Sequence, residues 1–218
     1  LLSVAALREA VPGLGASIQG ALAVPGDGHA IGYEVTRRFL SRGRARLLRN
    51  APVREITLRG GRAAGVETDA GPIAADAVLV AAGMGSGALI GMAGALVPRK
   101  GQMAITDRAV PSGPPIGGHL MSATYLETKR RLPRGETHVG LVVDPLMTGQ
   151  FLIGSSREDN VTDRTTTLDI ISRILAEALE LYPPLAQRRV IRTFAGIRTA
   201  TQDGLPNVGR HGTVDGLT

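Results

Sequence analysis

An unbroken apolar run from Asp76 to Gly83 restricts the fold of this chain more than any other part of the sequence. The run reads Asp-Ala-Val-Leu-Val-Ala-Ala-Gly and has no polar residue after its first position. Such a run predicts a short strand that is covered on both faces, as in a parallel sheet. Glycines at positions 83, 85 and 87 then lead into a short helix.

The end of this predicted strand has two interpretations. Residues without large side chains at the carboxyl end of a strand let a ligand approach the backbone, and a helix N-terminus there favours an anion. The same glycines also suit an ordinary connection between a strand and a helix. The run by itself leaves both interpretations open.

The rest of the first half predicts short elements. Leu1 to Pro12 has the pattern of the end of a helix, and Ala30 to Leu40 has apolar residues at helical spacing. Gly60-Gly61 is a hairpin turn in this interpretation, since glycine accepts positive φ without strain. The predicted short strands around it are Arg46–Leu48, Val53–Leu58, Ala63–Thr68 and Gly71–Ala74.

The second half has a different pattern. Apolar and polar residues alternate in several segments between Val97 and Gly154, which predicts an antiparallel sheet. Thr165 to Leu181 is the clearest helix, and Pro183-Pro184 ends it. A strand follows at Val190 to Ile197. The predicted apolar stripe of the helix comprises Leu168, Ile171, Leu175, Ala178, Leu179 and Tyr182. The fold class is therefore α/β plus α+β.

Composition excludes several classes of function. The 218 residues contain no Cys, which rules out a disulfide scaffold, a thiolate zinc site, a Cys nucleophile and a Cys-linked cofactor. The net charge is +6, but aromatic residues make up only 3%, too few for a groove that stacks bases. No apolar stretch approaches the ~18 residues of a membrane span, and no leader pattern is present, so we expect no nucleic-acid partner, no transmembrane segment and a cytoplasmic location.

The histidines give no metal site. His29, His119, His138 and His211 do not stand at the spacing of metal ligands, and no Gly-x-Ser-x-Gly elbow is present. His29 follows Asp27 in a loop before a predicted helix, where either residue can cap the helix or close the turn.

The strongest local signal is the segment from Phe194 to Gly209. Arg198 follows an apolar strand and precedes a polar turn. If its side chain faces a cavity, the planar guanidinium can hold a carboxylate through two parallel hydrogen bonds. A structural ion pair explains the same pattern, and the residues alone leave the two explanations equal.

This segment, Phe-Ala-Gly-Ile-Arg-Thr-Ala-Thr-Gln-Asp-Gly-Leu-Pro-Asn-Val-Gly, resembles a signature of the FAD-dependent D-amino-acid oxidase superfamily, which includes glycine and sarcosine oxidases. Further stretches resemble the same family in the same order, so that the likeness covers nearly the whole chain. Around Gly149 the chain is most similar to the FAD-carrying subunits of opine oxidases, hydroxyproline dehydrogenases and hydrogen cyanide synthase. The other matching stretches are Gly26–Leu40, Asn50–Ile56 with Gly65–Thr68, Asp76–Gly83 and Pro98–Gln102.

The resemblance implies a role for several residues. Val53 meets the adenine of FAD, Ala82 and Gly83 line its phosphate and ribityl side, and Gly209 also contacts the cofactor. Arg198 holds the substrate carboxylate while hydride passes from the amine-bearing carbon to the flavin. The expected partners are a small amino acid or amine and an electron-accepting partner subunit, which would place the protein peripherally on the inner membrane.

The chain also departs from the family pattern. The Gly-x-Gly-x-x-Gly turn that takes the FAD pyrophosphate is absent, and so is the loop that covers the flavin after Gly209. Lys100 replaces an Arg, and Thr199 replaces a Pro. The Tyr of glycine oxidases maps near Val142, which leaves Tyr125 as its substitute. Without Cys, FAD is held non-covalently.

We therefore expect a piece of a FAD-dependent amino-acid or secondary-amine oxidoreductase, with both ends missing. Its substrate would be glycine, a D-amino acid, a proline derivative or an opine. The expected domains are residues 1–96 as the central part of a Rossmann-like FAD-binding domain, 97–195 as a substrate-binding antiparallel sheet with the helix at 165–181, and 196–218 as a return to the FAD domain. The alternative is a non-catalytic subunit or binding module that has lost its nucleotide-binding half.

Overall fold

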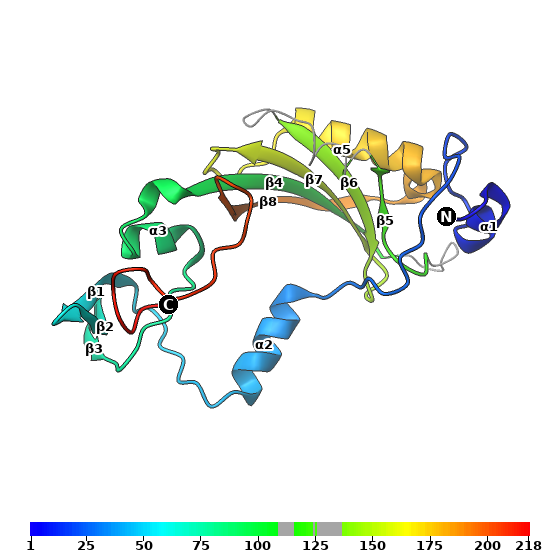
Figure 1. The fold of residues 1–218 in the computed structure, drawn as a ribbon. Coiled ribbons are helices and arrows are strands. Elements are labelled where there is room, and N and C mark those ends of the chain that lie inside the picture. Colours follow the sequence, from blue (N-terminus) through cyan, green and yellow to red (C-terminus); the bar gives the residue numbers. More distant parts are fainter. Residues whose placement is uncertain (109–115, 124, 126–136) are drawn as a thin grey trace. The chain divides into compact units, whose positions relative to one another are not determined.

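The computed structural model describes residues 1–108, 116–123, 125 and 137–218. The chain forms two compact units, each of which combines segments far apart in the sequence (Figure 1). Unit 1 comprises Leu1–His29 and Arg99–Ile197, and unit 2 comprises Ala30–Pro98 and Arg198–Thr218. In the part of the chain that is described, no helix has the length and apolar character needed to cross a membrane.

Unit 1 is built on a five-stranded sheet in the order β5-β6-β7-β4-β8. The pairs β5–β6, β6–β7 and β7–β4 are antiparallel, which confirms the prediction from the alternating residues. Gly149, with φ 84°, closes the turn between β6 and β7. The strands are β4 (Leu96–Thr106), β5 (Leu120–Met121), β6 (His138–Pro145), β7 (Phe151–Asp159) and β8 (Val190–Thr201).

Helix α5 (Leu168–Leu181) packs on β6 and β7 and encloses the core of unit 1 (Figure 1). The predicted helix is confirmed, and η3 (Pro183–Gln187) follows it. The predicted stripe is partly wrong, because Leu168 is 84% exposed whereas Ile174 is fully buried. The buried side chains that form this core are Ile116, Val139, Leu141, Val143, Phe151, Ile153, Ile170, Ile171, Ile174, Ala178, Tyr182 and Leu185.

Two aromatic rings meet in this core. Tyr182, directly after α5, is buried, and its ring centroid lies 6.1 Å from that of Phe151 on β7. Tilted rings at this separation contribute beyond the apolar area that they bury. The contact attaches the end of α5 to the sheet.

A short N-terminal helix, α1 (Val4–Ala10), is followed by a loop that packs on the end of α5. Arg8 donates to the backbone carbonyls of Leu14, Gly15 and Ala16, and Gly15 N–H donates to Leu181 O at 2.9 Å. One guanidinium thus satisfies several carbonyls of a loop that has no regular secondary structure.

Unit 2 contains a three-stranded antiparallel sheet, β1-β2-β3, and helix α2 (Gly32–Arg42). Gly60 and Gly61 have positive φ in the predicted hairpin turn. The remaining elements are β1 (Val53–Arg59), β2 (Arg62–Thr68), β3 (Gly71–Ala74), η1 (Gly83–Gly85), α3 (Ser86–Leu89) and η2 (Ala93–Ala95).

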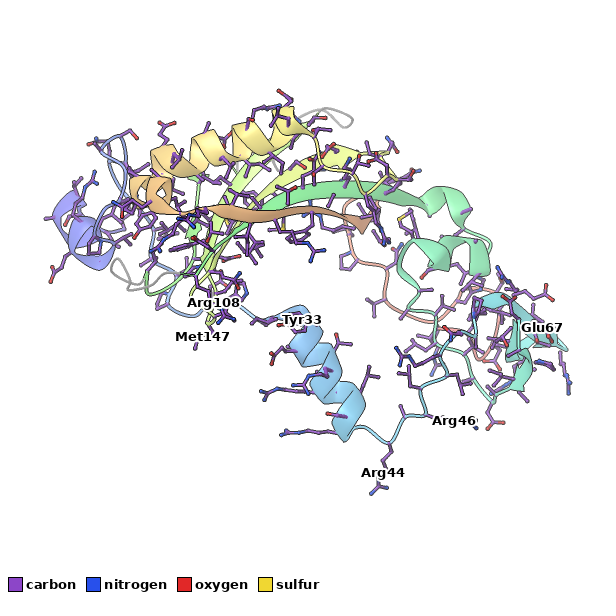
Figure 2. All side chains as sticks on the ribbon, turned by 180° about the vertical axis from the view of Figure 1, so that it is seen from behind. Tyr33, Arg44, Arg46, Glu67, Arg108 and Met147 are labelled. Carbon is purple, nitrogen blue, oxygen red and sulfur yellow. The ribbon has the colours of Figure 1, made fainter. Side chains whose placement is uncertain are left out.

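The strand predicted at Arg46–Leu48 does not form. These residues have no regular structure, and Leu47 and Leu48 are exposed. Arg44 and Arg46 lie on the stretch between α2 and β1, and Tyr33 lies on α2 (Figure 2). Alternation over three residues is too short a pattern to specify a strand that has nothing to pair with.

The apolar run after Asp76 has a parallel neighbour but is not buried on both faces. Val78 pairs in parallel with Leu217, and Val80 N–H donates to Thr218 O at 2.8 Å. Leu79 is nevertheless 74% exposed. The prediction of a strand covered on both faces is therefore wrong for the described residues, none of which forms a layer over Leu79.

Candidate functional site

The turn after the apolar run lies in unit 2 and presents an open backbone. Gly83 has φ 58°, a left-handed conformation that glycine adopts without strain. Ala82 N–H donates to Ser86 Oγ at 3.0 Å, and Gly85 N–H donates to Ala82 O at 3.1 Å. Ala82 and Gly83 are both exposed. Because α3 has only four residues, its dipole adds little to anion binding here.

The end of β8 meets this turn. A Cβ placed on Gly83 would lie 3.5 Å from Thr199 Oγ1, which is ordinary van der Waals contact. Arg198, the preceding residue on β8, is exposed. The structure thus brings Gly83 next to the strand end that carries Arg198, two candidates that are widely separated in the sequence.

Side-chain contacts fix the loop after β8. Gln202 Nε2 donates to Gly94 O at 2.8 Å, and Thr201 Oγ1 donates to Leu205 O at 2.7 Å. Leu205 N–H donates to Asp203 Oδ1 at 3.0 Å. These bonds hold the polar turn after Arg198 against η2 and against itself.

The other two cofactor candidates also lie in unit 2. Val53 is the first residue of β1, it is 39% exposed, and β1 contacts α3. Gly209 has φ 154°, and a side chain there would meet no other atom within 4 Å. The strand that carries Val53 is therefore near the turn, whereas no described contact brings Gly209 to it.

Tyr125 belongs to unit 1. Its ring lies over Gly140 of β6, so closely that a Cβ on Gly140 would overlap it. Tyr125 N–H donates to Ser122 O at 3.1 Å. Gly140 is two positions from Val142 on β6, and the role of Tyr125 stays a prediction.

The loop around His29 contains a set of acidic and histidine side chains that the sequence did not predict as a group. Gly28 N–H donates to Asp27 Oδ1 at 2.8 Å, which confirms Asp27 as a turn residue. His29 Nδ1 lies 3.4 Å from Asp144 Oδ1, and His119 Nε2 lies 3.7 Å from Asp27 Oδ2. Among the described residues, no group of three or more His, Asp or Glu side chains is arranged to hold a metal ion.

Lys100, which stands where the family pattern has Arg, is buried in unit 1. Its Nζ lies 2.8 Å from Asp163 Oδ1 and 3.9 Å from Glu158 Oε2. Hydrogen bonds from Lys100 and then from Thr165 hold the pKa of Asp163 well below its ordinary value. Both partners are carboxylates of the protein itself, so the contacts of Lys100 hold the fold together.

Comparison with known proteins assigns this chain to a family. The family model described as "FAD dependent oxidoreductase" matches residues 1–218. Glycine oxidase from Pseudomonas aeruginosa is 33% identical over 217 residues, which are 95% of this chain and 54% of that protein. The HcnC component of hydrogen cyanide synthase from Pseudomonas protegens is 29% identical over 224 residues, which are 99% of this chain and 49% of that protein.

Solved structures show the same fold. Glycine oxidase from Bacillus cereus superposes with a TM-score of 0.83 at 24% identity, over 99% of this chain and 57% of that one. L-proline dehydrogenase from P. horikoshii superposes with a TM-score of 0.83 at 24% identity, over 100% of this chain and 57% of that one. The predicted fold class, a part of a FAD-binding fold joined to an antiparallel sheet, is confirmed. The chain spans about half the length of the curated relatives that it matches.

The match over all residues and the Pseudomonas aeruginosa relative agree with the order of motifs in the sequence. The chain therefore belongs to the DAO family of FAD-dependent oxidoreductases.

Proposed function

We propose that the protein oxidises an amino acid or a secondary amine with FAD, and that Arg198 binds the substrate carboxylate. The observation that carries this proposal is the position of Arg198 on β8, directly before Thr199, whose Oγ1 lies 3.5 Å from the place that a Cβ on Gly83 would take. The strand end that bears a permanently charged guanidinium is therefore close to the open backbone turn. Glycine oxidases among the relatives support this class of substrate.

The residues of unit 2 fit a cofactor held without a covalent link. Ala82 and Gly83 are exposed and carry little or no side chain, so that a planar or phosphorylated group can approach their backbone. We assign Ala82, Gly83, Val53 and Gly209 to FAD on this basis and on the family pattern. Bound FAD supplies the acceptor for the hydride that leaves the amine-bearing carbon of the substrate.

The chain's own residues orient the substrate. The guanidinium of Arg198 can bind both carboxylate oxygens, which fixes the direction of the α C–H bond. Tyr125 is proposed as a second substrate residue on the family pattern alone. Oxidation of the substrate leaves an imine, which water hydrolyses without a further protein group.

The relatives support candidates for the partner and for the substrate. Two of them are named as subunits, one of hydrogen cyanide synthase and one of opine oxidase. A partner chain is therefore one candidate electron acceptor for this protein, and oxygen is the other. Substrate candidates are glycine, D-amino acids, proline derivatives and opines.

The experiment uses the product of the complete gene that contains these residues, purified with FAD. The flavin spectrum is recorded anaerobically while each candidate amine is added. Bleaching by at least one carboxylate-bearing amine is the expected result. A protein that retains FAD and is bleached by none of these compounds does not have the proposed function.

Arg198→Ala tests the carboxylate assignment. We expect KM to rise by about 100-fold or more while FAD remains bound, since a charged bidentate contact is lost. Arg192→Ala is the matched control, because Arg192 is also exposed and lies an even number of positions away on β8. Equal kinetics for the two variants would make Arg198 a structural residue.

A further inference from the structure

The apolar run of unit 2 is paired along one edge by a parallel neighbour. Val78 N–H donates to Gly216 O at 2.8 Å, and Thr218 N–H donates to Val78 O at 3.0 Å. In a parallel ladder a residue directs both of its backbone groups to the same neighbour, and the next residue directs its groups to the other side. The backbone groups of Ala77 and Leu79 therefore face the opposite edge.

This opposite edge is open among the described residues. The backbone N–H and C=O groups of Ala77, Leu79 and Ala81 make no hydrogen bond to another group of the protein there. All three residues are exposed, and Leu79 is 74% exposed. A row of free donors and acceptors of this kind is able to pair with a further strand.

The other edge strands of the molecule are protected in a way that this run is not. Charged side chains and proline oppose the pairing of an exposed edge with another strand. β1 has Arg54 and Glu55, β3 has Pro72, and β8 has Arg192. The run Ala77–Gly83 contains no charged residue and no proline. Its composition favours an edge that is paired in the complete protein.

A second stretch of unit 2 also has the composition of a strand and no neighbour. Arg46–Leu48 forms no regular structure, and Leu47 and Leu48 are 61% and 45% exposed. Two separate stretches of the same unit thus lack a strand beside them among the described residues. Both observations indicate that the sheet of unit 2 extends beyond the strands described here.

The described segments of unit 2 do not supply the neighbour for the open edge. β1, β2 and β3 form an antiparallel sheet of their own, and the segment at Gly216–Thr218 already pairs on the other side of the run. A parallel neighbour also needs a crossover connection of about a dozen residues or more. The chain covers 54% of the length of glycine oxidase from Pseudomonas aeruginosa, so a relative of that length has room for such a unit.

We propose that the open edge at Ala77–Ala81 binds a parallel strand that belongs to the complete gene product and lies outside residues 1–218. The strand is parallel because the neighbour already present, at Leu217, pairs with Val78 in parallel. It is apolar, because it lies beside a run without charge and beside the exposed side chain of Leu79. The inference concerns the backbone of one strand and does not rest on the proposed oxidation of an amine.

The first test is hydrogen exchange at single amides in the product of the complete gene. Leu79 and Ala81 should exchange as slowly as Val78 and Val80, and about 100-fold or more slowly than Met147, because a backbone hydrogen bond protects each of them. Met147 is the internal control, since it is 96% exposed in the turn between β6 and β7. Fast exchange at Leu79 and Ala81, alternating with slow exchange at Val78 and Val80, overturns the inference.

The same experiment identifies the occupant of the edge. Nuclear Overhauser contacts from the Leu79 amide should lead to residues outside 1–218, and contacts to residues within that range overturn the assignment. The protection of Leu79 should stay constant as the protein is diluted, because the strand belongs to the same chain. Protection that disappears on dilution assigns the edge to a second copy and overturns the proposed occupant.

Leu79→Lys tests the edge by mutation. A charge at a paired edge opposes pairing, so the variant of the complete gene product should melt roughly 5 °C or more below the wild type. Leu58→Lys is the matched control, because Leu58 is 50% exposed on β1, an edge strand that already carries charges. Its melting temperature should change by less than about 2 °C. Equal, small shifts for both variants overturn the inference.

The exchange measurement on the wild type keeps the test decisive if Leu79→Lys does not fold. Failure of the proposed function is recognised separately, as absence of flavin bleaching in a wild type whose Leu79 amide is protected.

Discussion

At the scale of single residues, Gly15 lies where a side chain has no room. Its N–H donates to Leu181 O, and a Cβ at this position would overlap the backbone carbonyl of Glu180. Gly15→Ala should therefore lower the free energy of unfolding by about 1–3 kcal/mol, because the loop must move off the end of α5. Gly20→Ala in the same loop, with no atom within 4 Å of the new Cβ, should change it by less than about 0.5 kcal/mol. Denaturant unfolding of both variants measures the difference, and equal values would contradict the packing described here.

Asp163 gives a prediction about pH. The hydrogen bond from Lys100, followed by those from Thr165, keeps the pKa of Asp163 well below its ordinary value of 3.8. A lowered pKa stabilises the fold only while the carboxyl is ionised, so its contribution is complete above about pH 5 and is lost as pH falls below 3.8. The difference in unfolding free energy between the wild type and Asp163→Asn should therefore be larger at pH 7 than at pH 3. A constant difference over this range would show that the carboxylate does not act through its charge.

At the scale of elements, α5 carries much of the core of unit 1. Ile174 is fully buried, so Ile174→Ala should lower the free energy of unfolding by about 2–5 kcal/mol through lost burial and the cavity that remains. Leu168→Ala removes an apolar side chain that is 84% exposed on the same helix and should cost less than about 0.5 kcal/mol. Thermal or denaturant unfolding separates the two variants. A larger loss of unfolding free energy from Leu168→Ala would mean that the stripe predicted from the sequence is the buried face of α5.

Helix α5 also shows which features can be predicted from the spacing of apolar residues and which cannot. The existence and end of α5 follow from apolar spacing and from Pro183, but its first turn contains neighbouring apolar residues on different faces. Spacing alone does not decide whether Leu168 or Ile170 meets the sheet. The strands β1, β2 and β3 are well predicted from the sequence, because their turns contain glycines that take positive φ.

At the scale of the whole molecule, the buried apolar side chains are unequally shared. The core cluster lies in unit 1, whereas α2 in unit 2 has no buried residue and its Phe39 is 76% exposed. Among the described residues of the 218-residue chain, limited trypsin digestion should therefore cut first after Arg44, Arg46 or Arg49, in a segment without regular structure. Arg173, within α5, is the internal control and should be cut later. Simultaneous cleavage at both places would mean that the two units have similar local stability.

Some features of the candidate site and of its surroundings could not be predicted from the sequence. The sequence predicts Gly83 and Arg198 separately, and only the fold shows that their segments meet through Thr199. The predicted burial of Leu79 is wrong, because an apolar run does not encode which layers cover it. The buried hydrogen bond from Gln102 Nε2 to Glu158 Oε1 is not predicted, since a Gln after a Gly in an alternating strand has no pattern that signals a buried amide.

The buried Tyr182 ring, which lies against Phe151, is an intrinsic spectroscopic probe of the unit 1 core. The chain has no Trp and three Tyr, so its near-ultraviolet absorption comes mainly from tyrosine. Burial raises the pKa of Tyr182, whereas Tyr33 is 72% exposed. In an alkaline titration followed by phenolate absorption, the Tyr182 signal should appear above the ordinary tyrosine pKa of 10.0. Near-ultraviolet circular dichroism of the 218-residue chain would then follow the integrity of the unit 1 core through its own chromophore, with no label attached.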